Sequence, residues 1–325
     1  MEARSGERSP PTWTESVTGL GWWGVPIAVL GGAIRVSTPF LFVSLGECIT
    51  ERSGRINLGL EGILVMGAVT GYALSYATGN PWVGVLAAAG AGFALGVLHG
   101  VLCNLPRVND IAVGIGLMLF GTGLAFFLGK PYVQPKAPTL SAIPLGGWSG
   151  SPQIRAALTV NPLFLIGIAL AVVLAWAFRN TRWGLVVRMV GDSADAARAM
   201  GHGVSRVRTL STGIGGGLAG IGGSFLSLYY PGSWSEGLSS GQGLMAVALV
   251  IFARWNPLQC FYAALLFGGA GALGPALQSV GITSGYYLFN AAPYVVTLGL
   301  MIATCSPRRA LTGAPGELSI TRAGR

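Results

Sequence analysis

Apolar stretches separated by short polar ones recur along most of the chain. A helix that crosses a bilayer needs about 20 consecutive, mostly apolar residues. The pattern predicts an all-α polytopic membrane protein with about nine transmembrane helices. These lie near residues 36–50, 59–78, 82–104, 110–128, 160–179, 206–228, 241–255, 258–278 and 287–304. The stretches 36–50 and 241–255 are short, so the sequence leaves open whether they cross completely, tilt, break or re-enter.

The two ends of the chain are more polar than the part between them. Residues 1–23 lack the apolar core of a signal peptide, so we do not expect one there. Residues 22–34 have the character of an interfacial segment anchored by two tryptophans. We expect Arg35 at the membrane surface, because an arginine at the bilayer centre costs about 2.5–3.5 kcal/mol. The expected regions are residues 1–35, a transmembrane domain at 36–305 and a cytoplasmic tail at 306–325.

Composition and charge narrow the class of protein further. The 325 residues are 52% hydrophobic and only 10% charged, with a mean hydropathy of +0.62, which argues strongly against a soluble globule. Most of the 20 lysines and arginines fall on one side when the segment 179–208 is placed in the cytoplasm. Positively charged loops remain on that side of a membrane. The bias predicts an N-terminus outside and a C-terminus inside, and it explains the net charge of +9 without a nucleic-acid partner.

The segment 179–208 also has the composition of a short, capped helix. It carries six arginines and two aspartates between two apolar stretches. Asp192 or Ser193 can cap the helix, the alanines that follow favour it, and Gly201 and Gly203 can end it. We expect this helix at residues 191–203, on the cytoplasmic face, where a soluble partner protein can push on it.

Glycines recur at a spacing that favours close packing between helices. Gly92, Gly96 and Gly100 share one face of the third expected span, and the runs 213–223 and 268–274 are similarly rich in small residues. Helices in lipid associate through such small-residue faces. Part of the run 213–223 also matches the dinucleotide-binding pattern G-x-G-x-x-G, but no strand precedes it, so packing is the better interpretation.

Catalytic, metal and nucleotide sites find little support in the sequence. Ser149 lies in a G-x-S-G string but in a proline-rich segment, and topology separates it from His99 and His202, the two histidines of the chain. We expect His99 to be a packed, hydrogen-bonded helix residue rather than a ligand. No phosphate-binding G-x-x-x-x-G-K-[ST] sequence is present. We therefore expect no catalytic residue, metal site or cofactor in this chain, and any ATP to be bound by a separate ATPase subunit.

The segment 129–159 contains five prolines and few helix-forming residues. Connections of about 30 residues without regular structure are uncommon and often functional. We expect an extracellular loop here and a candidate surface for a partner protein.

Two polar residues near the start of the second span, Asn57 and Glu61, admit two interpretations. Asn57 can cap the helix, and a carboxylate such as Glu61 is favoured in a first turn. A carboxylate one turn into a membrane span is costly unless it is paired or hydrated, which favours a role in a translocation path. Arg52 and Arg55 are the expected partners of Glu61.

Two strings resemble a known family. They are TPFLFVSLGECITERSGRINLGLEGILVMGA at 38–68 and GDSADAARAMGHGVSRVRTL at 191–210. Together they resemble the permease subunit of bacterial ABC importers, in the nucleoside (basic-membrane-protein-type) branch that is related to ribose and branched-chain amino-acid permeases. The resemblance extends over residues 36–304.

The resemblance implies roles for particular residues. The helix 191–203 is similar to the coupling helix that docks on the ATPase, although Asp192-Ser193 replaces the usual Asn-Pro. The residues implied in coupling are Gly191, Asp192, Ala196, Ala197 and Gly201. The first string lies near the translocation path in such permeases, and intramembrane polar residues elsewhere are further candidates. The path candidates are Asn57, Gly59, Glu61, Gly62, Gln242 and Asn290.

The resemblance also implies a function and partners. It predicts a multi-pass protein of the bacterial cytoplasmic (inner) membrane that imports a nucleoside-like solute. The expected partners are an ABC ATPase, a second permease subunit, homologous or identical, and an extracellular substrate-binding lipoprotein. Riboflavin or a simple sugar is the alternative solute. A stand-alone, ion-coupled secondary transporter is the alternative class, but Glu47, Glu61 and Asp110 all fall near span ends, which counts against it.

Overall fold

A computed structural model describes residues 24–133, 135–279, 288–289, 291–304 and 313–320. Almost all regular structure within these residues is helical. The helices are α1 (Gly24–Arg52), α2 (Leu60–Thr78), α3 (Pro81–Cys103), α4 (Asp110–Gly129), the 3-10 helix η2 (Lys130–Tyr132), α5 (Pro152–Ala157), α6 (Pro162–Asn180), α7 (Arg182–Asp192), α8 (Ala194–Ala199), α9 (Val204–Leu228), α10 (Gln242–Phe252), α11 (Pro257–Ser279), α13 (Ala292–Thr304) and α14 (Gly316–Ile320). Two short strands, β1 (Ile143–Pro144) and β2 (Thr159–Val160), form an antiparallel pair.

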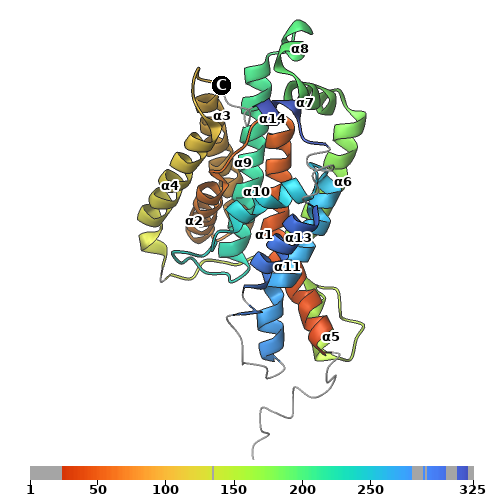
Figure 1. Ribbon diagram of the computed structural model, residues 1–325. Coiled ribbons are helices and arrows are strands. Elements are labelled where there is room, and N and C mark those ends of the chain that lie inside the picture. The colour runs from red at the N-terminus through yellow and green to blue at the C-terminus, as the bar shows by residue number, and fades with distance from the viewer. Residues whose placement is uncertain (1–23, 134, 280–287, 290, 305–312, 321–325) are drawn as a thin grey trace, which may run out of the picture.

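The long helices form one bundle, with α8 at one end and α5 at the other (Figure 1). Within the described residues, six helices are long and apolar enough to cross a membrane: α1, α2, α3, α4, α6 and α11. The all-α membrane fold is thus as expected, but nine spans are not confirmed. Of the other three expected spans, 206–228 forms the less apolar α9, whereas 241–255 and 287–304 yield only the 11-residue α10 and the 13-residue α13.

Helix α1 continues across the boundary expected at residue 35. It starts at Gly24 and runs for 29 residues with Pro39 inside it, so the short first span is the second half of a longer helix. Its early turns lie beside α5, because Gly31 contacts Ala157 and the guanidinium of Arg35 donates a hydrogen bond to the Ala156 carbonyl at 3.2 Å.

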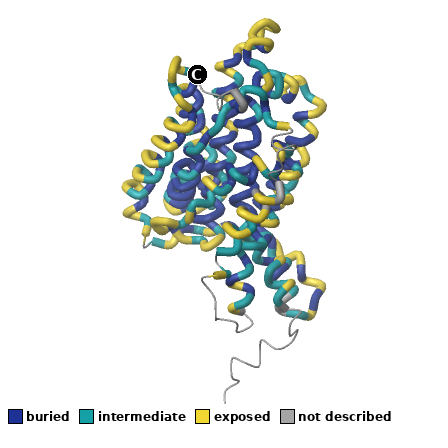
Figure 2. Tube along the Cα trace, viewed as in Figure 1, coloured by how far each residue is buried: buried dark blue, intermediate teal, exposed yellow. Residues whose placement is uncertain are grey.

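Helix α9 lies among α1, α2 and α3 and is buried along most of its length (Figures 1 and 2). Its glycines let these helices approach until backbone meets backbone. A Cβ added to Gly92 or Gly96 of α3 would lie 2.2 Å from a carbonyl oxygen of α9, that of Gly216 or Thr212. The small-residue face predicted on the third span is therefore confirmed, and it explains why a helix of modest hydrophobicity can lie inside the bundle.

The seventh expected span, 241–255, forms only the short helix α10, and the residues just before it, 229–241, are not helical. We call the segment 229–252 the broken span. Between α9 and α10 the chain has no regular helix, and it begins at the α5 end of the bundle, where buried Trp234 lies against Gly129. It then passes along α2 and α4, where Leu238 packs with Leu60 and Leu117, and reaches α10 inside the bundle (Figure 1). Non-helical backbone at membrane depth occurs only where protein or a water-filled cavity surrounds it.

The proline-rich segment 129–159 is tied to the ends of the long helices. The Tyr72 hydroxyl donates to the Pro135 carbonyl at 2.8 Å, and the Ser75 hydroxyl donates to the Pro138 carbonyl at 2.7 Å. The Leu140 amide donates to the last carbonyl of α9 at 2.8 Å. One large apolar side chain of this segment, Trp148, is 76% exposed. The segment 129–159 is therefore hydrogen-bonded to the ends of α2 and α9, and the side chain of Trp148 projects from it.

Candidate functional site

The segment predicted to form one helix at 191–203 forms parts of two helices. Helix α7 continues through Gly191 and Asp192, and the chain then breaks at Ser193. The hydroxyl of Ser193 accepts a hydrogen bond from the Ala196 amide at 3.3 Å, so Ser193 is the cap, which leaves Asp192 in the preceding helix. Helix α8 ends before Gly201, whose φ of +83° is the conformation that the expected glycine stop requires.

The coupling candidates divide into an inward and an outward set. Gly191 and Ala197 are buried, and Ala197 packs with Val190, Ala194 and Val204. The outward set is Asp192, Ala196 and Gly201, all of them exposed. Met200, which is 71% exposed, follows α8, the helix that forms the tip of the molecule in Figure 1. Gly191 and Ala197 therefore lie inside the fold and not on its surface.

At the start of α2, Asn57 organises the turn that precedes the helix. Its side-chain oxygen accepts a hydrogen bond from the Gly59 backbone amide at 2.9 Å, and the backbone amide of Asn57 donates to the Glu47 carboxylate at 2.8 Å. Asn57 therefore stabilises the turn before the helix and is not its cap as expected, because the N-cap residue is Gly59 and the helix has no side-chain cap hydrogen bond. Gly62 lies against the Leu117 and Met118 carbonyls of α4, where no Cβ would fit.

The carboxylate of Glu61 binds the start of α10. One oxygen accepts hydrogen bonds from the Ser239 hydroxyl at 2.5 Å and the Gly241 amide at 3.1 Å, and the other accepts from the Gly243 amide at 2.6 Å. The first amides of a helix have no partner within the helix, so a carboxylate satisfies them well. The contact brings the first turn of α2 against a segment about 180 residues later in the chain. We call this group the Glu61 clasp.

The expected arginine partners of Glu61 bind elsewhere. Arg55 forms an ion pair with Asp110 at 2.7 Å, and the Arg52 side chain donates to the Trp255 carbonyl at 2.9 Å. The predicted pairing was wrong because the broken span supplies neutral donors closer to Glu61.

The remaining path candidates are only partly placed. Gln242 is the first residue of α10, next to the Glu61 clasp, and its Oε1 is buried without a hydrogen-bond partner among the residues that the structure describes. Asn290 lies outside the described residues.

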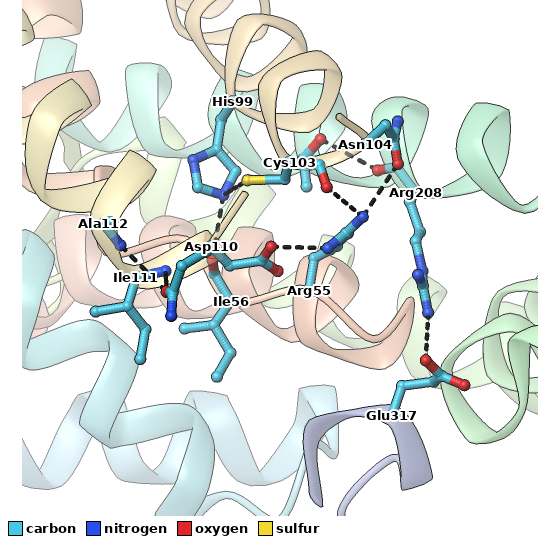
Figure 3. A network of polar contacts seen from close by, with 12 residues as sticks. Arg55, Ile56, His99, Cys103, Asn104, Asp110, Ile111, Ala112, Arg208 and Glu317 are labelled. Carbon is cyan, nitrogen blue, oxygen red and sulfur yellow. Dashed lines mark hydrogen bonds and ion pairs between the residues drawn. The ribbon is translucent and has the colours of Figure 1, made fainter. Parts of the chain in front are cut away.

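A polar network joins the helix ends on the α8 side of the bundle (Figure 3). Besides pairing with Asp110, Arg55 donates to the Cys103 carbonyl and to Asn104, which in turn donates to Thr209 at 2.8 Å. The residue before Thr209 in α9, Arg208, pairs with Glu317 of α14 at 3.0 Å. The network therefore links α3, α4, α9 and α14.

Comparison with known proteins identifies the family. Residues 19–305 match the model of a family described as the permease component of the branched-chain amino acid transport system. The chain belongs to this family. It is thus a component of an ABC transporter, a multi-pass protein of the inner membrane and not an enzyme. Permeases of this kind work with an ATPase and a substrate-binding partner.

Relatives of this permease carry different substrate names. A putative glucose ABC transporter permease of Haloferax volcanii, TsgC13, is 35% identical over 270 residues, which cover 78% of this chain and 79% of the relative. The nucleoside ABC transporter permease NupC of Lactococcus lactis is 30% identical, covering 83% and 90% of the two chains. The guanosine ABC transporter permease NupQ of Bacillus subtilis is 29% identical, covering 83% and 89%.

Two features of this permease were not found from its sequence. The clasp donors Ser239, Gly241 and Gly243 lie at or just before the start of the expected span 241–255, where no sequence pattern marks them as partners of Glu61, and Glu317 lies in the expected cytoplasmic tail. Their positions depend on contacts between distant segments. By contrast, the expectation that His99 is a packed, hydrogen-bonded helix residue is confirmed, since it is buried and its Nε2 donates to the Ile56 carbonyl at 3.1 Å.

Proposed function

We propose that this permease subunit imports a nucleoside-like solute, driven by ATP that a separate ATPase subunit hydrolyses. The observation that carries the proposal is the arrangement of α8 at the tip of the bundle. Its Ala194 and Ala197 are packed inward, whereas Asp195, Ala196 and Met200 face outward. A helix that is firmly packed on one side and open on the other is suited to receive a push from a docked protein.

This role sets the orientation of the chain. The α8 end of the bundle faces the cytoplasm, in agreement with its arginines. Helix α1 begins beside α5, so its start at Gly24 lies on the outer side, and α14 contacts the α8 side, so this segment lies on the inner side (Figure 1).

The two ends of the bundle, at α8 and at α5, offer surfaces for different partners (Figure 1). The ATPase docks on the outward face of α8, and ATP is bound there rather than in this chain. An extracellular substrate-binding lipoprotein docks on the segment 129–159, where Trp148 protrudes. A second permease subunit, homologous or identical, completes the pore. The exposed apolar side chains of α4, among them Leu119 and Phe120, are one surface available to lipid or to that subunit.

The translocation path runs by the start of α10. Polar groups concentrate there: the Glu61 clasp, the side chain of Gln242 and the non-helical backbone of the broken span. Such breaks often form solute sites in transporters. Asn57, Gly59 and Gly62 support the path by shaping the start of α2, and Asn290 remains a candidate. Alternating access follows when ATP-driven closure of the ATPase moves α8 and tilts the helices around this point.

A simple sugar is the second candidate solute, because TsgC13 is named as a putative glucose permease. The sugar rings of a nucleoside and of glucose offer similar hydroxyl groups to the permease, so the choice between them needs a direct measurement. We expect uptake of labelled guanosine by membranes that contain the complete importer to be inhibited by unlabelled nucleosides and not by glucose. Uptake of labelled glucose, with no uptake of labelled guanosine by the same membranes, would assign the sugar.

The coupling role is tested with Ala196→Trp, a bulky change at an exposed position. We expect the variant to accumulate in the membrane normally but to lose both co-purification of the ATPase and ATP-driven uptake. Ala156→Trp is the matched control, since Ala156 is also exposed but lies in α5 at the opposite end, and it should retain the ATPase. An Ala196→Trp variant that still binds the ATPase and transports would overturn the proposal. Uptake by the chain alone, driven by an ion gradient, would instead indicate a secondary transporter.

A further inference from the structure

The described C-terminal segment, residues 313–318, lies beside the coupling region and the ends of the core helices. Gly316 is so close to the Asp192 carbonyl that an added Cβ would lie 2.4 Å from that oxygen. Leu318 is 7% exposed and packs in the same hydrophobic cluster as Ile49 and Val187. The segment is therefore a packed part of the fold and not a loose tail.

Glu317 connects two elements that are otherwise far apart in the chain. Its Oε1 accepts a hydrogen bond from the Ala194 amide, the first residue of α8, at 2.9 Å. Its Oε2 forms the ion pair with Arg208 of α9 at 3.0 Å, in which the two side chains are 22% and 9% exposed. One carboxylate thus binds the start of α8 and the first part of α9 at the same time, and Figure 3 shows its pair with Arg208.

Arg208 extends this connection to the turn between α1 and α2. Its Nε donates to the Ser53 carbonyl at 3.2 Å. The neighbouring Gly54 has a φ of +84°, and an added Cβ there would lie 3.0 Å from the Cβ of Glu317 and 3.2 Å from both the guanidinium of Arg208 and the Cα of Gly191. The turn at Gly54 is thus packed closely against Glu317, Arg208 and Gly191, so a movement of Glu317 also moves this turn.

We propose that Glu317 is a positioning residue that transmits the movement of α8 to the transmembrane helices. The inference rests on the coupling role proposed for α8. Helix α8 has only six residues, too few to be stable alone, so its position depends on what holds its ends. Ser193 and Glu317 hold its start. Through Glu317 and Arg208, a displacement of α8 reaches α9, the helix against which α1, α2 and α3 pack, and the turn that leads to the Glu61 clasp.

The test is the number of solute molecules taken up per ATP hydrolysed by the complete importer in proteoliposomes. Glu317→Gln keeps the size of the side chain but removes the charge that pairs with Arg208. We expect it to lower this ratio about fivefold, the lower end of typical coupling between sites. Co-purification of the ATPase and basal ATP hydrolysis should persist. Arg179→Gln is the matched control, because it also removes one charge but Arg179 is exposed at the end of α6, so its ratio should match that of the wild type.

A double-mutant cycle shows whether the two residues act together. If Glu317 acts through Arg208, adding Arg208→Gln to Glu317→Gln should lower the ratio no further than the more affected single variant does. Fully additive losses would overturn the proposed link. Should Glu317→Gln fail to accumulate, Glu317→Asp replaces it, since the shorter carboxylate keeps the charge but cannot reach both partners, and the same loss is expected. A wild-type ratio in a well-folded Glu317 variant would reject the inference. If the wild-type importer itself shows no ATP-dependent uptake, the proposed function fails instead.

Discussion

Two carboxylates in this permease perform the same task in different surroundings. Glu61 binds the start of α10 inside the bundle, and Glu317 binds the start of α8 at its end. In both cases a side chain distant in sequence satisfies the first amides of a short helix, which cannot satisfy them itself. Each contact therefore fixes the position of a helix that is too short to be stable without tertiary contacts.

The two sites differ in what else binds the carboxylate. Glu61 receives two backbone amides and a hydroxyl, all from residues 239–243, and no ion pair with it occurs among the residues that the structure describes. Glu317 divides its two oxygens between a backbone amide and Arg208. The first arrangement makes one local, closed unit. The second joins α8 to α9, so it can pass a displacement from one to the other.

The difference predicts that the Glu61 clasp contributes more to stability and Glu317 more to coupling. A buried donor that loses its partner costs about 1–3 kcal/mol, and Glu61 satisfies three. The charge on Glu317 is partly exposed, so the pair with Arg208 is screened by water and contributes less.

Glu61→Ala should have the largest effect. It leaves the Ser239 hydroxyl and the Gly241 and Gly243 amides without their acceptor, so we expect a loss of about 3 kcal/mol or more in stability and loss of uptake. The measurement is the thermal unfolding midpoint of the purified chain in detergent, together with uptake. The midpoint of Glu61→Gln should lie between those of Glu61→Ala and the wild type, because the one remaining side-chain oxygen can still accept a hydrogen bond. An unchanged midpoint for Glu61→Ala would show that α10 is held by packing alone.

Gly243→Ala probes the same clasp by crowding it. The new Cβ would lie 2.6 Å from the Cα and the amide nitrogen of Glu61, which are backbone atoms and cannot turn away. We expect α2 and α10 to separate slightly, at about 1–3 kcal/mol, with reduced uptake. Gly116→Ala in α4 is the matched control, since no atom lies within 4 Å of its added Cβ. Equal midpoints for the two alanine variants would contradict the close approach of α2 and α10.

Sequence reasoning recovered what depends on short-range pattern. Six of the expected membrane helices, the small-residue face of α3 and the cap at Ser193 are local features, and the structure contains them. It failed where a contact joins distant segments. Arg52 and Arg55 were expected to bind Glu61 because they are near in sequence, whereas the true donors come from a broken span. Apolar content predicted the helical part of that region, now α10, but it does not reveal which backbone amides at the helix start meet a distant carboxylate. Likewise, Glu317 sits in a polar tail whose sequence gives no sign of its partners.

The smallest effect should come from Asp195→Asn, which separates the importance of Glu317 from charge in general. Asp195 pairs with Arg198 at 2.6 Å within α8, but the two side chains are 95% and 61% exposed. Exposed pairs of this spacing contribute little, because water screens them and long side chains lose freedom when they pair. We expect the unfolding midpoint of the purified chain to change by no more than about 1 °C. Glu317→Gln should lower it more, because its carboxylate also anchors the Ala194 amide and lies against Gly54. If Asp195→Asn and Glu317→Gln lower the midpoint equally, then the hydrogen bond from the Ala194 amide to Glu317 adds nothing beyond an exposed ion pair. The contrast drawn between Glu317 and an ordinary surface carboxylate would then be wrong.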